Sequence, residues 1–412
     1  MADLFKIATR NLLRYRRRTI LTASLVTVGV VFVLVFISIS GSFRAMMVGQ
    51  ITDSMLGHLQ VHRRGYVASI DTLPLNMNLR AEAVKKIEAA LASLGAAESS
   101  SPRIKFGGMF SNFTETTNIR LNGVYPEREF KTAPLLAARI SNGKAAIEKG
   151  EIIIPILLSR GMGVKVGDSV VIVATNRDGS VNGKQFRVAG LMESATGPGG
   201  RDGYIHIEDA AELLRMAEME ISEIAVRLKN FDRLGAVTRE LEALLAGNLT
   251  EQGKPLFEVH NWEKLSPFYN IARMIDLMTF FIKLMLIAIV LISIMNVMIM
   301  AVYERIREIG TIAAIGTPPR KILTLFLIEG LCLGVLGAIS GGVLGTVIVS
   351  LIDMAKIAFD FGQQTGIILS AAVRPADLLV VSAIVVLVSV IASLQPALKA
   401  SRLEPIDALR HV

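Results

Sequence analysis

Four apolar stretches, each long enough to cross a lipid bilayer, constrain the fold of this chain more than any other feature of its sequence. The residues between Arg18 and Arg44, and those that follow Asp377, include no charged side chain over a full span. From Leu277 to Val302 the only charge is Lys283, and from Ile322 to Ile352 it is Glu329. Because a membrane-spanning helix needs about 20 predominantly apolar residues, we predict four transmembrane helices, over residues 19–43, 276–302, 322–352 and 378–398.

The basic residues predict the direction in which these helices cross the membrane. Thirteen Lys and Arg residues lie in the segments 1–18, 303–321 and 399–412, and two lie in the short loop 353–377. Loops that flank the spans carry more Lys and Arg on the cytoplasmic side. We therefore predict that both termini are cytoplasmic and that the long segment 44–275 lies outside.

The first span could instead be a signal peptide, because Ser38-Ile39-Ser40 resembles a cleavage site. Its apolar run is longer than the usual core of about 7–15 residues, so we predict an uncleaved helix. Residues 1–18 are predicted to form an amphipathic helix, with Leu4, Ala8 and Leu12 on one face and basic residues nearly opposite. Such a helix can lie on an anionic leaflet; the alternative is a solvated extension of the first span.

Composition bears on the possible partners. The net charge of +8 would suit nucleic acid binding, but the basic residues cluster beside the apolar spans, which indicates membrane topology signals. We therefore predict the lipid bilayer, and no nucleic acid, as a partner. The single cysteine, Cys332, excludes a disulfide within the chain and says little about the redox compartment.

The segment 44–275 is predicted to be a mixed α/β domain. Hydrophobic periodicity predicts helices near 81–94, 208–217 and 231–246, strands at 151–156 and 222–228, and two strands within 167–192 around a Gly/Asn/Asp turn. The segment 196–203, TGPGGRDG, is predicted to be a flexible loop. The fold class is therefore an α-helical membrane protein with four transmembrane helices and a large mixed α/β extracytoplasmic domain inserted between the first and second helices.

The sequence carries little that indicates catalysis. GSVNGK (179–184) and GNLTEQGKP (247–255) resemble a phosphate-binding loop only loosely, because their spacing is wrong. His58 and His62 have the spacing of helical zinc ligands, but GHLQVH reads better as a strand and lacks the glutamate of the zinc motif. We predict no catalytic residue, no metal site and no cofactor on this chain, which is not an enzyme by itself.

The charged segment 303–321, between the second and third spans, is predicted to form a short helix. Ile306, Ile309 and Ile312 recur at helical spacing, and Gly316 is expected to end the helix. Two i, i+3 charge pairs, Arg305 with Glu308 and Glu304 with Arg307, are expected on its exposed side, and Thr317 before two prolines is expected to cap the third span. A rigid helix fixed to two spans could act as a lever for a partner. The alternative is a connecting loop whose charges only keep it inside.

The third span has two rows of small residues. Such rows let helices approach closely, and they could form a dimer face or pack within one subunit. The residues are Gly330, Gly334, Ala338 and Gly342 in one row and Gly337, Gly341 and Gly345 in the other. Of the two intramembrane charges, Lys283 can snorkel to the outer interface, whereas Glu329 is a candidate functional acid whose role the sequence leaves open.

The segment RIREIGTIAAIGTPPRKI (305–322) resembles the R-x-R-E-I-G-x-x-x-A-x-G stretch of FtsX/MacB-type ABC transporter permeases. FLIEGLCLGVLGAISGGVLG (326–345) is similar to that family's third span, and PALKASRLEPIDALR (396–410) is similar to its C-terminal segment. GHLQVHRRGY (57–66) further resembles the lipoprotein-releasing LolC/LolE-type branch. The resemblance covers the membrane part well and the outer domain loosely.

The resemblance implies a function. Two such permeases pair as copies or paralogues in the bacterial inner membrane, and each docks a separate ATPase that holds ATP and Mg²⁺. The implied ATPase contact consists of Arg305, Arg307, Glu308, Ile309, Gly310 and Gly316. The implied periplasmic domain has a porter-like part and a smaller part, and further partners would be a lipoprotein cargo or a periplasmic adaptor.

The sequence leaves three functions open. The first is export or membrane extraction of a lipidated or hydrophobic substrate. The second is an FtsX-like signalling permease that regulates a periplasmic partner, such as a cell-wall hydrolase, without transport. The third is a membrane-anchored sensor with no ATPase. The size of the outer domain favours the first over the second.

Overall fold

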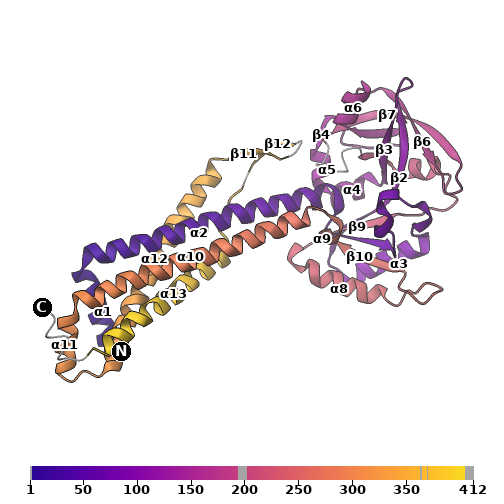
Figure 1. Ribbon diagram of the computed structural model, residues 1–412. Coiled ribbons are helices and arrows are strands. Elements are labelled where there is room, and N and C mark those ends of the chain that lie inside the picture. The colour runs from indigo at the N-terminus through magenta and orange to yellow at the C-terminus, as the bar shows by residue number, and fades with distance from the viewer. Residues whose placement is uncertain (1, 194–201, 362–363, 369, 404–412) are drawn as a thin grey trace. The chain divides into compact units, whose positions relative to one another are not determined.

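The computed structural model describes residues 2–193, 202–361, 364–368 and 370–403 (Figure 1). Most of the predicted loop 196–203 and residues 404–412 of the predicted tail therefore lie outside the described residues. The chain divides into two compact units. We call them the helical unit (Met1–Ala45, Arg273–Ala358 and Ile368–Val412) and the head unit (Met46–Ala272 and Phe359–Ile367).

Long apolar helices form the helical unit. Its elements are α1 (Ala2–Arg14), most of α2 (Arg16–Ile51), most of α10 (Tyr269–Glu304), α11 (Ile306–Ala314), α12 (Pro319–Met354) and α13 (Pro375–Ser401). Four of the described helices are long and apolar enough to cross a membrane, at Thr19–Leu56, Tyr269–Glu304, Pro319–Met354 and Pro375–Ser401. The first two of these helices run well past the predicted spans, because a helix continues into polar sequence where an apolar run has already ended, whereas the last two end within three residues of the predicted bounds.

The core of the helical unit lies along the axes of these helices. Buried side chains from α2, α10, α12 and α13 meet there, among them Val30, Ile294, Phe326 and Val385. Leu286, Val290 and Met298 repeat at helical spacing along α10, so that one face of α10 is buried while many of its other apolar side chains are exposed. A helix that is apolar all round but buried on one face only is typical of a membrane span, since lipid can cover the rest.

The head unit is built on one large mixed sheet. The strand order is β10-β1-β9-β2-β3-β8-β5-β7-β4, and β6 pairs with β2 and β7. Most neighbours are antiparallel, whereas β3 with β8 and β5 with β7 are parallel. The strands are β1 (Leu59–Arg63), β2 (Ala97–Ser111), β3 (Thr116–Val124), β4 (Ile140–Gly143), β5 (Glu151–Pro155), β6 (Ser169–Thr175), β7 (Val181–Met192), β8 (Asp202–His206), β9 (Glu223–Leu228) and β10 (Phe257–Asn261).

Short helices accompany the sheet. They are α3 (Ala81–Leu94), α4 (Pro126–Thr132), α5 (Pro134–Ala138), α6 (Ile156–Met162), α7 (Ile207–Leu213), α8 (Leu234–Leu245) and α9 (Trp262–Leu265), with 3₁₀ turns at Val67–Thr72, Leu75–Met77 and Phe231–Arg233. The first long helix, α2, ends in a π-helical turn at Thr52–Leu56. Ile87 and Leu91 of α3, and Val237 and Leu241 of α8, are buried at helical spacing, which shows why these segments fold as amphipathic helices.

Most of the local predictions for the outer segment are confirmed. The predicted helix 81–94 is α3, and the predicted strands are β5, β9 and the β6–β7 pair. The helix predicted at 208–217 ends earlier, at Leu213. The segment 353–377, predicted as a short loop, contains two short strands, β11 (Ala358–Phe361) and β12 (Gln364–Ile368), which pair with each other.

Candidate functional site

The segment between the second and third spans forms the predicted short helix, α11. The helix α10 ends at Glu304, Arg305 breaks it with φ −112° and ψ 15°, and α11 then runs from Ile306 to Ala314. Gly316 adopts φ +97°, a left-handed conformation that glycine takes at no steric cost, and so ends α11 as predicted. Thr317 does not cap α12: Pro318 is the N-cap residue, and its extended backbone starts the helix at Pro319.

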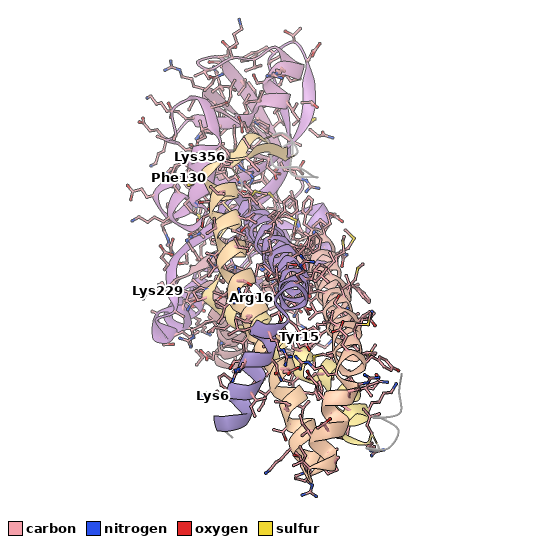
Figure 2. The ribbon with its side chains drawn as sticks, turned by 90° about the vertical axis from the view of Figure 1, so that its left-hand side faces the viewer. Lys6, Tyr15, Arg16, Phe130, Lys229 and Lys356 are labelled. Atoms are coloured by element: carbon pink, nitrogen blue, oxygen red, sulfur yellow. The ribbon has the colours of Figure 1, made fainter. Side chains whose placement is uncertain are left out.

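Arg305 lies at the base of α11 and points into the protein. It is 6% exposed, and its Nη1 donates a hydrogen bond to Oε1 of Glu329 at 2.8 Å. The Tyr15 ring lies below its guanidinium, with the centroid 4.6 Å from Cζ. Figure 2 shows Tyr15 at the bend where α1 passes into α2. The expected exposed pair of Arg305 with Glu308 is wrong, because the backbone break at Arg305 turns its side chain toward α12.

Glu329 also accepts a hydrogen bond from the N-terminal helix α1. Nδ2 of Asn11 donates a hydrogen bond to Oε1 of Glu329 at 2.9 Å, so one carboxylate oxygen accepts from α1 and from the base of α11. Glu329 is 2% exposed. Arg14 of α1 lies 3.6 Å from Glu308 of α11, as an exposed ion pair. We call Arg305, Glu329, Asn11 and Tyr15 the inner polar cluster.

The predicted contact residues divide into an exposed and a buried group. Arg307, Glu308 and Gly316 are exposed, whereas Ile309, Gly310 and Arg305 are buried. Two further apolar side chains are exposed, Ile312 at 42% and Ile315 at 80%. The exposed side of α11 therefore offers charges and large apolar groups together, which is a composition that suits a protein partner.

Both glycine rows of α12 are filled within the chain. A Cβ on Gly330 or Gly334 would lie 2.6 Å or less from Ser393 or Ser389 of α13. On the other row, a Cβ on Gly337 or Gly341 would lie within 2.5 Å of Val26 or Val30 of α2, and one on Gly345 would lie 3.0 Å from Leu34. These rows therefore pack within the subunit, and the structure gives no reason to assign them to a dimer face. Lys283 lies part-exposed on α10.

The head unit holds a second charged cluster, which sequence reasoning missed. Arg103 of β2 is 2% exposed and makes a two-pronged contact with Glu129 of α4, from Nε at 3.0 Å and from Nη2 at 2.7 Å. Its Nη1 donates to Glu223 of β9 at 3.0 Å and to the carbonyl oxygen of Met55 at 2.7 Å. We call these four residues the head cluster. Arg103 and Lys105 alternate with Pro102, Ile104 and Phe106 in SPRIKF, and charges at alternate positions of a strand-like segment are the signal that could have found it.

The charges around Glu223 shift its ionisation. Burial alone would raise the pKa of the Glu223 carboxyl, but Lys105, His62 and Arg103 hold it well below its usual range. Nearby, burial raises the pKa of Asp202 to about 6 despite Lys105 and Arg120. The Glu223 carboxylate is therefore ionised and paired at neutral pH.

The two histidines of the sequence motif have structural contacts. Nδ1 of His58 accepts a hydrogen bond from the N–H of Leu228, and Nε2 of His58 lies 3.5 Å from Asp53. The His62 ring stacks on Tyr66. Among the described residues, no group of three or more His, Cys, Asp and Glu side chains could hold a metal ion.

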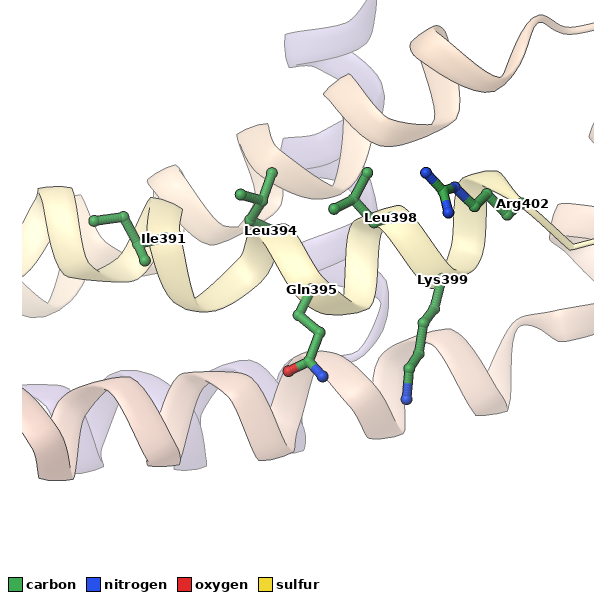
Figure 3. A pocket seen from close by; sticks show the side chains of 6 residues that line it. All are labelled: Ile391, Leu394, Gln395, Leu398, Lys399 and Arg402. Atoms are coloured by element: carbon green, nitrogen blue, oxygen red, sulfur yellow. The ribbon is translucent and has the colours of Figure 1, made fainter.

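A hollow of about 300 Å³ lies at the C-terminal end of α13 (Figure 3). It combines apolar side chains with two cations at the end of an apolar helix, as expected where a span meets charged headgroups. Its lining residues are Ile391, Leu394, Gln395, Leu398, Lys399 and Arg402.

Comparison with known proteins identifies related families. Residues 19–244 match the model of the MacB-like periplasmic core domain, and residues 280–405 match that of the FtsX-like permease C-terminal domain. The chain is 23% identical over 416 residues to the lipoprotein-releasing system transmembrane protein LolC of Neisseria meningitidis, an alignment that covers 95% of this chain and 94% of that protein.

Relatives with an attached ATP-binding part also match. The chain is 30% identical over 241 residues to the macrolide export ATP-binding/permease protein MacB of Nitrobacter winogradskyi, covering 56% of this chain and 34% of that protein. Among solved structures, the periplasmic region of MacB from Actinobacillus actinomycetemcomitans is 14% identical with a TM-score of 0.35, covering 54% of this chain and 94% of that one.

Proposed function

We propose that this chain, which belongs to the FtsX/MacB-type family of ABC transporter permeases, transmits the motion of a separate cytoplasmic ATPase to its outer domain. The observation that carries this proposal is the form of α11. Its base is fixed by buried Ile309 and by Arg305, while Arg307, Glu308 and Ile315 are exposed. A partner that binds the exposed side would therefore move α10 and α12 together.

ATP and Mg²⁺ would be held by the partner, and the chain itself would supply the contact and the movement. We assign the direct contact to Arg307, Glu308 and Gly316, with Ile312 and Ile315 added. The buried residues Arg305, Ile309 and Gly310 would instead hold α11 in place. In this scheme both termini and α11 are cytoplasmic, the head unit is periplasmic, and two permease copies or paralogues pair in the bacterial inner membrane.

The proposed cargo is a lipidated or hydrophobic molecule such as a lipoprotein. Similarity to a lipoprotein-releasing transmembrane protein along nearly the whole chain supports this choice. The second candidate is a signalling permease that regulates a periplasmic partner without transport, and it shares the same coupling geometry. A lipoprotein that crosslinks to the head unit and is released from vesicles only with ATP would support transport. ATP-dependent activation of a periplasmic hydrolase without release would support signalling.

Copurification in mild detergent tests the ATPase contact. We expect an ATPase to copurify with the full chain and to be lost in Ile315→Asp, because a charge would be placed in an apolar contact. Leu249→Asp is the matched control, since Leu249 is an exposed aliphatic residue of the head unit. Loss of the ATPase in both variants, or in neither, would contradict the assignment.

Thiol labelling tests the orientation of α11. We expect an Ala314→Cys thiol to be labelled from the cytoplasmic side, and labelling from the outer side would contradict the orientation.

A further inference from the structure

The N-terminal helix α1 contacts the inner polar cluster through one side chain. Asn11 reaches Glu329 of α12 at 2.9 Å, and Arg305 reaches the same carboxylate oxygen at 2.8 Å. Ala8, one turn before Asn11, is fully buried, and α1 packs against α12. Three separate parts of the sequence, at residues 11, 305 and 329, thus meet at a single carboxylate.

The chemistry of this meeting point suits a positioning role. A carboxylate within an apolar helix is costly unless it is paired, and Glu329 is paired with the base of α11 and with α1 at once. Nε of Arg305 is buried without a hydrogen-bond partner among the described residues. The arginine therefore depends on Glu329 and on the Tyr15 ring for its stabilisation.

The other contacts of α1 reinforce this arrangement. Oγ1 of Thr19, at the start of the first span, donates to the carbonyl oxygen of Leu12 at 2.8 Å across the bend at Tyr15. Arg14 pairs with Glu308 on the exposed side of α11. The helix α1 is thus connected both to the base and to the exposed side of α11.

We propose that Glu329 is a positioning residue that holds α1 on α12 and on the base of α11, so that the N-terminal helix is a third moving part of the coupling segment. This proposal rests on the proposed function for its coupling role, whereas the docking of α1 stands on the contacts alone. Glu329 touches no ATPase in this scheme, because it is 2% exposed.

Thiol accessibility tests the docking of α1. The full chain would carry Cys332→Ser, which removes the one native thiol, and Ala8→Cys, which places a probe on the buried face of α1. We expect slow maleimide labelling in detergent when Glu329 is present. Glu329→Gln should label roughly tenfold faster or more, because a neutral amide accepts the hydrogen bonds of Arg305 and Asn11 more weakly than a carboxylate does, and Asn11→Ala should label several-fold faster.

Thr27→Val is the matched control. It removes a hydrogen bond of 2.6 Å between α2 and Ser340 of α12 without touching α1, so the labelling rate should stay within about twofold. Fast labelling with Glu329 in place, or unchanged labelling in both Glu329→Gln and Asn11→Ala, would overturn the docking of α1.

The complex with the ATPase tests the coupling role. With Glu329→Gln, the ATPase should still copurify and its KM for ATP should stay the same, while the permease-dependent rise in kcat falls. The double variant Arg305→Gln with Glu329→Gln should recover much of this rise, because no buried charge is then left unpaired. Faster labelling with unchanged kcat would overturn the coupling role, as would loss of the ATPase itself.

The two proposals fail in different ways. If no ATPase copurified with the unsubstituted chain, the proposed function and the coupling role would both fall. The labelling rates would still decide whether Glu329 holds α1.

Discussion

The two units each bury one arginine with carboxylates, but they surround it differently. In the head unit, Arg103 uses three of its nitrogens on two glutamates and on a backbone carbonyl oxygen. In the helical unit, within the part of the chain that the structure describes, Arg305 donates one hydrogen bond, to one oxygen of Glu329, and its Nε has no hydrogen-bond partner. The arginine of the head cluster is therefore held by more hydrogen bonds than the arginine of the inner polar cluster. Because fewer bonds hold Arg305 than Arg103, we expect the head unit to resist local rearrangement more strongly than the segment around α11.

The largest expected effect tests the rigid side of this comparison. Arg103→Met leaves Glu129 and Glu223 buried without their shared cation, so we expect the head unit to lose about 3–5 kcal/mol of stability. Trp262 is the single tryptophan of the chain and is 2% exposed in the head unit, so its fluorescence during denaturation measures this loss. Lys105→Met is the control, because Lys105 pairs with Glu223 from a part-exposed position and should cost less. Equal losses of stability in the two variants would contradict a larger contribution from Arg103 than from Lys105.

The next effect tests where the helical unit is rigid. Gly337→Ala and Gly341→Ala each place a Cβ within 2.5 Å of a valine of α2, so we expect each to cost about 1–3 kcal/mol through overpacking. Gly41→Ala is the matched control, since a Cβ there meets nothing within 4 Å. Loss of helical circular dichroism during SDS titration measures the difference. If these glycines formed a dimer face instead, the two variants would weaken dimerisation and leave the stability of the monomer unchanged.

A smaller effect probes the electrostatics of the head unit through pH. Burial raises the pKa of Asp202 to about 6, above its unfolded value. Its protonated form therefore adds stability that is complete below about pH 4 and is lost as pH rises through about 6. Asp202→Asn should remove this dependence and gain about 1–2 kcal/mol over the unsubstituted chain at pH 7. The free energy of unfolding at each pH from about 4 to 8, followed by Trp262 fluorescence during denaturation, checks this prediction. Parallel plots of that free energy against pH for the two proteins would contradict the assignment.

The smallest effect tests the exposed contact of α1. Arg14 and Glu308 form a pair of 3.6 Å whose side chains are 68% and 48% exposed. Screened surface pairs contribute about 0–1 kcal/mol, so Arg14→Gln should change the stability of the helical unit by less than about 0.5 kcal/mol. An effect as large as that of a buried substitution would show that α1 is held at its surface and would weaken the comparison between the clusters.

The sequence predicted what depends on local pattern. Hydrophobic runs predicted the four spans, and the periodicity of 81–94 predicted α3 at its observed bounds. The apolar face and Gly316 predicted α11. Arg305 was misplaced, because pairing at i, i+3 assumes one unbroken helix, and the backbone breaks at Arg305 itself.

Contacts between distant residues were beyond such reasoning. Glu329 was left without a role, although an acid and a base near the same end of two spans are complementary charges. The partner of Glu329 from α1 lies 318 positions away in the chain, and no spacing rule connects them. The head cluster was missed for the same reason, since its charges come from β2, α4 and β9, which only the sheet order brings together.

The long strand β2 has a consequence for how the head unit can change. On one edge its first half pairs with β9 as far as Arg103, and on the other edge its second half pairs with β3 from Arg103 onward. The portion of the sheet that contains β9 and the portion that contains β3 are therefore both hydrogen-bonded to one continuous strand, and Arg103 is the residue at which the two pairings meet. Removal of either portion would leave half of β2 with unpaired backbone N–H and C=O groups, and such an edge is prone to aggregation. Any bending between the two portions would therefore distort β2 and the Arg103 contacts at its middle.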